Sequence, residues 1–272
     1  PANGANGVSA DSMALITHEN RSGLESQIGR YAPYDGDAFA ALNTAFLHDG
    51  AYINIPDGRA EPVIVRLSYI TAGCAAPKVT HPRTLIVAGK NPDVTVVESY
   101  VGPKDSEYFT NAVTEFSLAD GARIDHYRLL LEGEKAFHVG TSRVKQGKDS
   151  SFNSASFALG TALARNDLQV LLDGPGAYCS LNGLYLTADN QHIDNLIGID
   201  LGDIHAELAG VAPIDVIPSR PLDEVHLRHT VGLTDPIRTA DIAAESRLHD
   251  GLPQSLEEYI DRHRLRYFKI KV

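Results

Sequence analysis

The chain has 272 residues, 43% of them hydrophobic, which is a normal content for a globular protein with a substantial core. Its formal net charge is −11 and its lysines and arginines are scattered, so no basic face is visible for nucleic acid or anionic lipid. With no apolar run near the roughly 18 residues of a membrane helix, and with Cys74 and Cys179 forming no CxxC pair, we expect a soluble, cytoplasmic protein without disulfides.

The first 50 residues predict a mostly irregular lead-in with one short helix. Up to about Tyr34 the chain is rich in Gly, Asn, Ser and Ala. After Asp37, the side chains of Phe39, Leu42 and Phe46 recur at helical spacing, and HDG then ends the pattern. The chain opens on Pro1 and stops on an apolar FKIKV, which is typical of a fragment or a fusion.

Short β-type runs bounded by Gly, Asn, Asp and Pro follow from Ala51 to about Ile197. Their spacing is regular. One series of runs starts at Asp93, Ala122, Ser150 and Ala177, in steps of 27 to 29 residues, and a second starts at Arg83, Ala112, Ala136 and Ala162. Two strands per repeat of about 27 residues favour a parallel β-solenoid of about six coils over a β-sandwich.

The stretch LNGLYLTADNQHIDN, residues 181–195, gathers polar side chains around one apolar strand. Asn and Asp suit the corners of coils, so a strand followed by a turn is the simpler interpretation. A metal or cluster site is the alternative. In a strand His192 and Asp194 would point to the same side, and Cys179 could join them only from another coil.

Catalytic motifs are weak. The sequence contains neither a GxSxG nucleophile elbow nor a GxxxxGK[ST] phosphate loop, so we expect no ATPase in this chain. Glu132 and Glu134 flank Gly133 at a predicted coil corner, where a solvated turn is expected. His126 and His138 lie in strand runs and could be packed or exposed.

Residues 198–220 are predicted to be a linker. After it, the sequence pattern of residues 221–272 predicts a small α/β appendage. TDPIRTADIAAESRL predicts a helix with Pro236 in its first turn. SLEEYIDRH has the Ser255 to Glu258 spacing of a capping box, and RYFKIKV predicts a strand.

Several ordered motifs resemble the SufB/SufD family of iron–sulfur cluster assembly proteins. They are ALNTAFLHDGAYINIPDG, DGARIDHYRLLLEG and the segment from FHVGTSRVKQG to QHIDN, of which LNGLYL and QHIDN are the strongest and closest to SufD. The resemblance covers about residues 37–195. It implies a right-handed parallel β-helix that is a non-catalytic scaffold, working with a SufB-like protein and a SufC-like ATPase around a transient iron–sulfur cluster at a partner interface.

The family pattern breaks after Asn195, where LIGIDLGDIHAELAG replaces the expected further coils. The resemblance therefore assigns no cluster ligand, and Cys179, His192 and Asp194 stay candidates from their residue types alone.

The tail, from HTVGLTDPIRTADI to RYFKIKV, resembles the barrel entry of the enolase superfamily, in its mandelate racemase-like branch. That resemblance implies a general-base role for Lys269 or Lys271 and a Mg²⁺ cofactor, although a basic pair on a terminal strand is the simpler interpretation. A β-helix enzyme acting on carbohydrates ranks last, because the chain has no Trp for stacking on sugars.

Overall fold

The computed structural model describes residues 2–3, 7–18, 24, 27–72, 78–188, 190–200, 228–231, 236–248, 251–264 and 267–270. The chain divides into two compact units, Pro1–Ala209 and Gly210–Val272, which are described separately. Cys74 and the larger part of the predicted linker lie outside the described residues.

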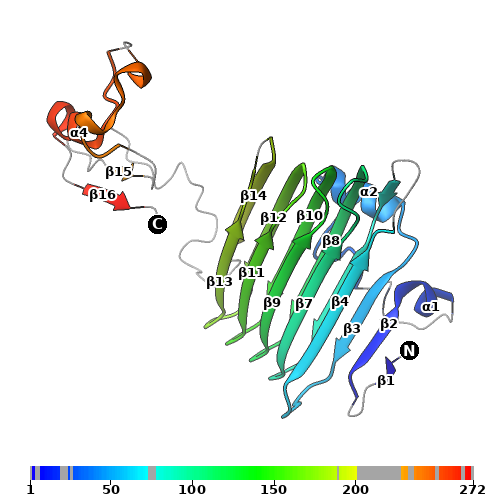
Figure 1. The fold of residues 1–272 in the computed structure, drawn as a ribbon. Coiled ribbons are helices and arrows are strands. Elements are labelled where there is room, and N and C mark those ends of the chain that lie inside the picture. Colours follow the sequence, from blue (N-terminus) through cyan, green and yellow to red (C-terminus); the bar gives the residue numbers. More distant parts are fainter. Residues whose placement is uncertain are drawn as a thin grey trace. The chain divides into compact units, whose positions relative to one another are not determined.

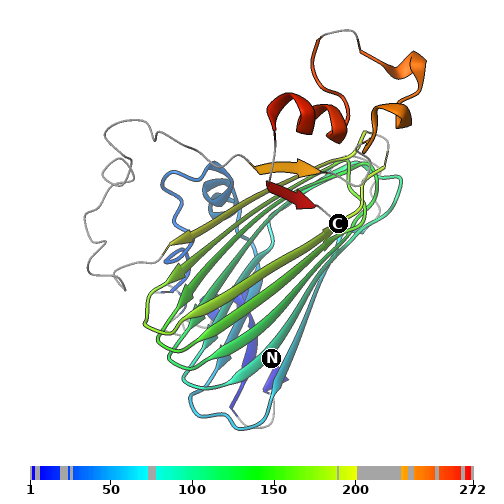
Figure 2. The ribbon, with the colours of Figure 1, turned by 90° about the vertical axis from the view of Figure 1, so that its left-hand side faces the viewer.

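The first unit is a parallel β-solenoid of about five turns, so the predicted architecture is confirmed with one coil fewer than expected. Strands of successive coils run side by side in two layers (Figures 1 and 2). The first sheet has the order β1-β2-β3-β6-β8-β10-β12-β14, and the second has the order β13-β11-β9-β7-β4. From β6 to β14 consecutive strands thus alternate between the two sheets, as the two interleaved series in the sequence predict.

The strands of the first sheet are β1 Ala2–Asn3, β2 Ser9–Ser12, β3 Gly50–Ile55, β6 Arg83–Ala88, β8 Tyr108–Leu118, β10 Ala136–Gln146, β12 Leu163–Leu172 and β14 His192–Asp200, with β5 Lys78–Thr80 paired to β8. Those of the second are β4 Val63–Ile70, β7 Asp93–Val101, β9 Arg123–Leu131, β11 Ser151–Ala158 and β13 Tyr178–Tyr185. All pairings are parallel except those of β1 with β2 and of β2 with β3.

The core lies between the two sheets and is built by alternation. In β7 and β9 every second side chain is buried, as a period of two requires. Phe116 of β8 and Phe152 of β11 are fully buried, and their ring centroids lie 5.1 Å apart between the layers. At one coil corner Gly121 has a φ of +70°, a conformation that costs glycine nothing and that brings its Cα against the Asn91 side chain.

The lead-in covers the outer face of the first sheet. It holds α1 Met13–His18 as well as the expected helix, α2 Ala38–Ala45, whose first amides donate to the Asp37 carboxylate at 3.0 Å. Glu115 of β8 ties it down, because its carboxylate accepts from the backbone N–H groups of Gly29, Tyr31 and Ala32 at 2.9 to 3.0 Å. The same carboxylate is bound by the buried guanidinium of Arg83.

The second unit has the predicted α/β character. β15 Arg228–Val231 pairs in parallel with β16 Tyr267–Ile270, and α4 Leu256–His263 begins at Ser255, whose Oγ accepts from the Glu258 amide at 3.2 Å. The helix predicted around TDPIRTADIAAESRL is wrong. Two short 3₁₀ turns, η2 Thr239–Asp241 and η3 Ala244–Ser246, occupy this stretch, which carries apolar residues too sparsely to cover a face.

Among the described residues, no helix combines the length and the apolar composition that crossing a membrane requires.

Replacing Phe116 by Ala should lower the free energy of unfolding by about 3–5 kcal/mol, because a fully buried ring leaves a cavity between two sheets that cannot both move inward. Urea denaturation measures this. The matched control is Phe137→Ala in the neighbouring strand, where the ring is 39% exposed and the loss should be clearly smaller. Equal losses would contradict the assignment of Phe116 to the core.

Glu115→Gln should release the lead-in, because the neutral amide no longer balances Arg83 and turns an NH₂ group toward backbone donors. Trypsin should then cut faster after Arg30, which is exposed in the segment that Glu115 holds. Glu107→Gln is the control, since that side chain is exposed. Unchanged cleavage in Glu115→Gln would show that other contacts hold the segment.

Candidate functional site

The most unusual part of the molecule is a set of charged and titratable side chains inside the solenoid, here called the interior polar array. Its members are Glu98 of β7, His126 and Arg128 of β9, Glu132 just after β9, and His138 of β10, each at most 6% exposed. Burying such groups is unfavourable unless each one is paired and hydrogen-bonded. The hydrogen bonds of the array therefore decide its chemistry.

Glu98 is the centre of one half of the array. Its Oε1 accepts from Thr84, Thr114 and the Tyr100 hydroxyl at 2.8 to 3.2 Å, and its Oε2 lies 3.4 Å from His126 Nε2. Burial alone would raise the pKa of Glu98, but the hydrogen bond and charge of His126, together with Arg128, lower this pKa to about 2. The carboxylate is therefore ionised at neutral pH.

Glu132, His138 and Arg128 form the other half. His138 Nδ1 lies 2.7 Å from Glu132 Oε2, and Arg128 Nη2 donates to His138 Nε2 at 2.8 Å. Because a guanidinium can only donate, Nε2 must accept, so the single ring proton is on Nδ1 and is donated to Glu132. His138 is thus neutral, which agrees with burial lowering its pKa against the opposing effect of Glu132.

An aromatic stack lies over these charges. Tyr100 has Arg128 over its ring at 5.4 Å from the centroid, meets His138 edge-on at 4.7 Å, and stacks on Tyr69 at 5.1 Å. Arg128 also donates to Asn166 at 2.7 Å, whereas its Nε has no hydrogen-bond partner among the residues that the structure describes. A small enclosed cavity beside Arg128, of about 10 Å³, has room for one water molecule that could accept this bond.

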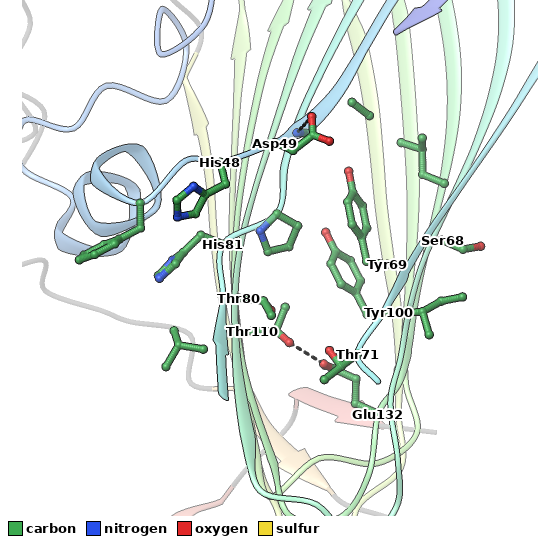
Figure 3. A pocket seen from close by; sticks show the side chains of 17 residues that line it. His48, Asp49, Ser68, Tyr69, Thr71, Thr80, His81, Tyr100, Thr110 and Glu132 are labelled. Carbon is green, nitrogen blue, oxygen red and sulfur yellow. Dashed lines mark hydrogen bonds between the residues drawn. The ribbon is translucent and has the colours of Figure 1, made fainter. Parts of the chain in front are cut away.

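A cavity of about 590 Å³, the mouth cavity, opens at the first coil of the solenoid. Its lining includes His48, Tyr69, His81, Tyr100, Thr110 and Glu132. Figure 3 shows the two tyrosines on one side, the two histidines on the other, and the 2.8 Å bond from Thr110 to Glu132. Since Tyr100 and Glu132 belong to this lining, the mouth cavity reaches the interior polar array.

One wall of the mouth cavity carries the two imidazoles. His81 stacks on Phe46 with ring centroids 5.5 Å apart. Burial lowers the pKa of His81, and the nearby His48 lowers it further. Asp49, beside them, is engaged in the fold, because it accepts from Ser12 Oγ and from a backbone amide of α1. His81 Nδ1 also lies 3.3 Å from the side-chain amide nitrogen of Asn111, so this wall leaves His48 and the other ring nitrogen of His81 toward the mouth cavity.

The candidate ligands from the sequence are only partly brought together. His192 and Asp194 lie on the outward face of β14, where Asp194 pairs with Arg165 at 3.1 Å. Cys179 lies in the other sheet, on β13, and packs against the core as a free thiol whose pKa burial raises. Among the described residues, no group of three His, Cys, Asp or Glu could hold a metal ion. Lys269 lies in β16, and Lys271 is outside the described residues.

The interior polar array is the part of the site that sequence reasoning missed. The prediction that Glu132 lies in a solvated turn is wrong, because its side chain is buried against His138 and Thr110. A signal was present. In ARIDHYRLLLEG the residues 124, 126, 128, 130 and 132 alternate onto one face, and the apolar Ile124 and Leu130 mark that face as inward.

The low pKa of Glu98 makes a prediction about acid stability. Ionised Glu98 stabilises the fold above the ordinary pKa of 4.5, and this contribution is lost as pH falls from about 4.5 to about 2. The difference in unfolding free energy between the wild type and Glu98→Gln should shrink by ~3 kcal/mol over this range. Urea titrations at several pH values measure it, with the exposed Glu107→Gln as control. A difference that does not vary with pH would show that Glu98 is not ionised in the fold.

Comparison with known families gives two matches that together span most of the first unit. The family model described as SUF system FeS cluster assembly, SufBD core domain, matches residues 69–207, and the SufBD protein N-terminal region matches residues 2–66. The core match alone covers more than half of the 272 residues.

Individual relatives agree with the family match. The chain is 28% identical to an iron–sulfur cluster assembly SufBD family protein of Synechocystis over 73% of its own length and 45% of the relative's. It is 25% identical to the iron–sulfur cluster assembly protein SufD of Escherichia coli, over 65% of this chain and 41% of that protein. For protein ABCI7, chloroplastic, of Arabidopsis thaliana, the identity is 27% over 58% and 35% of the two lengths.

The chain thus spans less than half the length of each of these relatives. The matched segments coincide with the lead-in and the coils of the solenoid, and the interior polar array lies within the matched core domain. By sequence and by architecture, this chain belongs to the SufBD family of iron–sulfur cluster assembly proteins.

Proposed function

We propose that the chain is a non-catalytic scaffold subunit of iron–sulfur cluster assembly, acting with a SufB-like β-helix protein and a SufC-like ATPase. The observation that carries the proposal is the match of the SufBD core domain to the coils themselves. The sequence has no phosphate loop, so ATP hydrolysis would come from the ATPase partner. A cytoplasmic location and the absence of a resident cofactor belong to the same proposal.

The geometry of the interior supports a structural role for its charged groups. His138 donates to Glu132 and accepts from Arg128, and the Glu98 carboxylate accepts from three hydroxyl groups. Groups that satisfy one another in this way stabilise and orient the coils. A catalytic use would require breaking these bonds in a region without bulk water.

The last described coil offers a surface for a related β-helix. On the side away from the other coils, β13 and β14 have no strand partner among the described residues. The side chains of Ile197 and Ile199 belong to the inward-facing row of β14 yet are 50% and 53% exposed. Open strand edges with apolar side chains favour pairing with further strands. A SufB-like solenoid could supply them.

A cluster at such an interface would be cargo shared with the partner. Cys179 lies on the terminal strand of the second sheet, and His192 and Asp194 lie on the terminal strand of the first. Since these three residues are on different sheets, they do not make a complete site within this chain. Ligands from the partner would have to complete it.

The proposal predicts co-elution with purified SufB-like and SufC-like proteins in size exclusion, and visible absorption of a cluster after anaerobic reconstitution only in the mixture. Ile199→Lys should abolish co-elution, because it puts a charge on the open coil. Ile237→Lys is the control, since Ile237 is 61% exposed and lies in the second unit.

Two further outcomes separate the parts of the proposal. Cys179→Ser should leave co-elution intact and weaken the cluster absorption if its thiol is a ligand. Wild-type chain that neither co-elutes with the partners nor promotes a cluster would contradict the scaffold role. The alternative enolase-type activity predicts instead a Mg²⁺-dependent exchange of a substrate α-proton that is lost in Lys271→Ala.

A further inference from the structure

The two sheets of the solenoid end differently at the first coil. The first sheet continues past β3 into β2 and β1, whereas the second sheet ends at β4 within the described residues (Figure 1). Val8, just before β2, and Ala10, within β2, pack against the same core cluster as Val63 of β4. The first sheet therefore overhangs the edge of β4 by β2, and by the two-residue β1 only beside Ser9 and Ala10.

The inward side chains of β4 show that this edge is open. Leu67 and Tyr69 face the interior but are only partly buried. Their register partners one coil further, Glu98 and Tyr100, are at most 1% exposed. The mouth cavity runs along the same strand from Leu67 to Thr71. The space beside β4 is therefore a shelf roofed by the first sheet.

The free backbone groups of β4 can be assigned. The amide of Thr71 donates to the carbonyl oxygen of Val101 in β7 at 2.9 Å. Successive amides of a strand point to opposite sides, so every second amide of β4 points the same way as that of Thr71. Odd-numbered amides thus point to β7, and the even-numbered ones point to the open edge. These are the amides of Ile64, Arg66, Ser68 and Ile70.

The one charged side chain of β4 is that of Arg66. Arg66 is exposed on the outward face of β4, and within the part of the chain that the structure describes it makes no ion pair. An added strand would place an outward side chain directly next to Arg66. Cross-strand pairs of opposite charge stabilise a sheet, so an acidic side chain is favoured there.

We propose that β4 and the mouth cavity form a docking site for an extended acidic-apolar peptide segment of another protein. The segment adds a strand to the second sheet, its apolar side chains alternate into the mouth cavity beside Leu67 and Tyr69, and an acidic side chain faces Arg66. Main-chain hydrogen bonds provide the affinity, and the cavity and Arg66 provide the selectivity.

The overhang decides between a peptide and a second copy of the chain. Neighbouring strands are about 4.8 Å apart, so the overhang of β2 leaves a shelf roughly 5 Å wide, the width of one strand. One added strand fits under it. A second solenoid joined edge to edge at β4 would bring its own β1 and β2 into the same space, and the two overhangs would collide.

The probe is a fluorescent peptide of alternating valine and threonine with one central glutamate, compared with a peptide that has lysine in its place. Anisotropy should show tighter binding of the glutamate peptide by about two- to fivefold. Hydrogen exchange should show that the amides of Ile64, Arg66, Ser68 and Ile70 exchange readily in the free chain and become protected on binding. Arg66→Glu should reverse the peptide preference.

Ser68→Pro is the blocking variant, because its amide points to the open edge and its loss leaves the bonds to β7 intact. The matched control is Ser68→Ala, which keeps the amide and removes only the hydroxyl that contacts Ser99 Oγ at 3.1 Å. Binding should be lost in the first and kept in the second, with unchanged urea midpoints. Ile199→Lys should bind the peptide normally, which separates this site from the surface of the scaffold proposal.

Three results would overturn the proposal. The first is protection of the four amides in the free chain, which would mean that the chain covers its own edge. The second is concentration-dependent dimerisation of the chain that Ser68→Pro abolishes. The third is that the four amides exchange readily but neither peptide binds.

Discussion

The fold depends on one electrostatic constraint, which is that Glu98 must stay charged and paired inside the solenoid. In the parallel register Glu98 of β7 lies next to Arg128 of β9, and Val96 lies next to His126. Arg128 then reaches across to His138 and Asn166 in the first sheet. Removing one partner of such a network leaves an uncompensated buried charge, which costs far more than losing an exposed ion pair.

The same network fixes the register of the coils. An apolar interior of Val, Ile and Leu would tolerate several stacking arrangements at similar energy. A one-residue slip of β9 against β7 would turn His126 and Arg128 outward and leave the Glu98 carboxylate without its cationic and imidazole partners. Polar groups in the interior thus exchange some stability for a unique arrangement of the coils.

How much the sequence could predict follows from the range of the interactions involved. The cap at Asp37 and the alternation of the strand runs are local, and both were predictable. The interleaved series also predicted which strands share a sheet, because equal steps place equal positions in neighbouring coils. Local signals failed around Pro236, where a good first turn was not followed by an apolar face that could hold a helix.

The candidate site was less predictable because its partners are distant in sequence and meet only through the fold. Glu115 binds amides more than 80 residues earlier in the chain, and no pattern near Glu115 indicates this. Likewise Arg128 and Asn166 are 38 residues apart and lie on opposite sheets. The strand of His192 and Asp194 belongs to neither of the two series, so the sequence did not tell which sheet it joins, and this decides that both residues lie apart from Cys179.

The two sheets end together at one end of the solenoid and unequally at the other, and this difference decides what kind of partner each end could bind. At the last described coil both sheets end together, and Ile197 and Ile199 of the inward-facing row are half exposed there. At the first coil the overhang of β1 and β2 excludes a second solenoid but admits a strand. Because three strands of the second sheet, β11, β9 and β7, lie between β13 and β4, the two proposed docking surfaces do not overlap. The proposed solenoid partner and the proposed peptide segment therefore do not compete for the same surface.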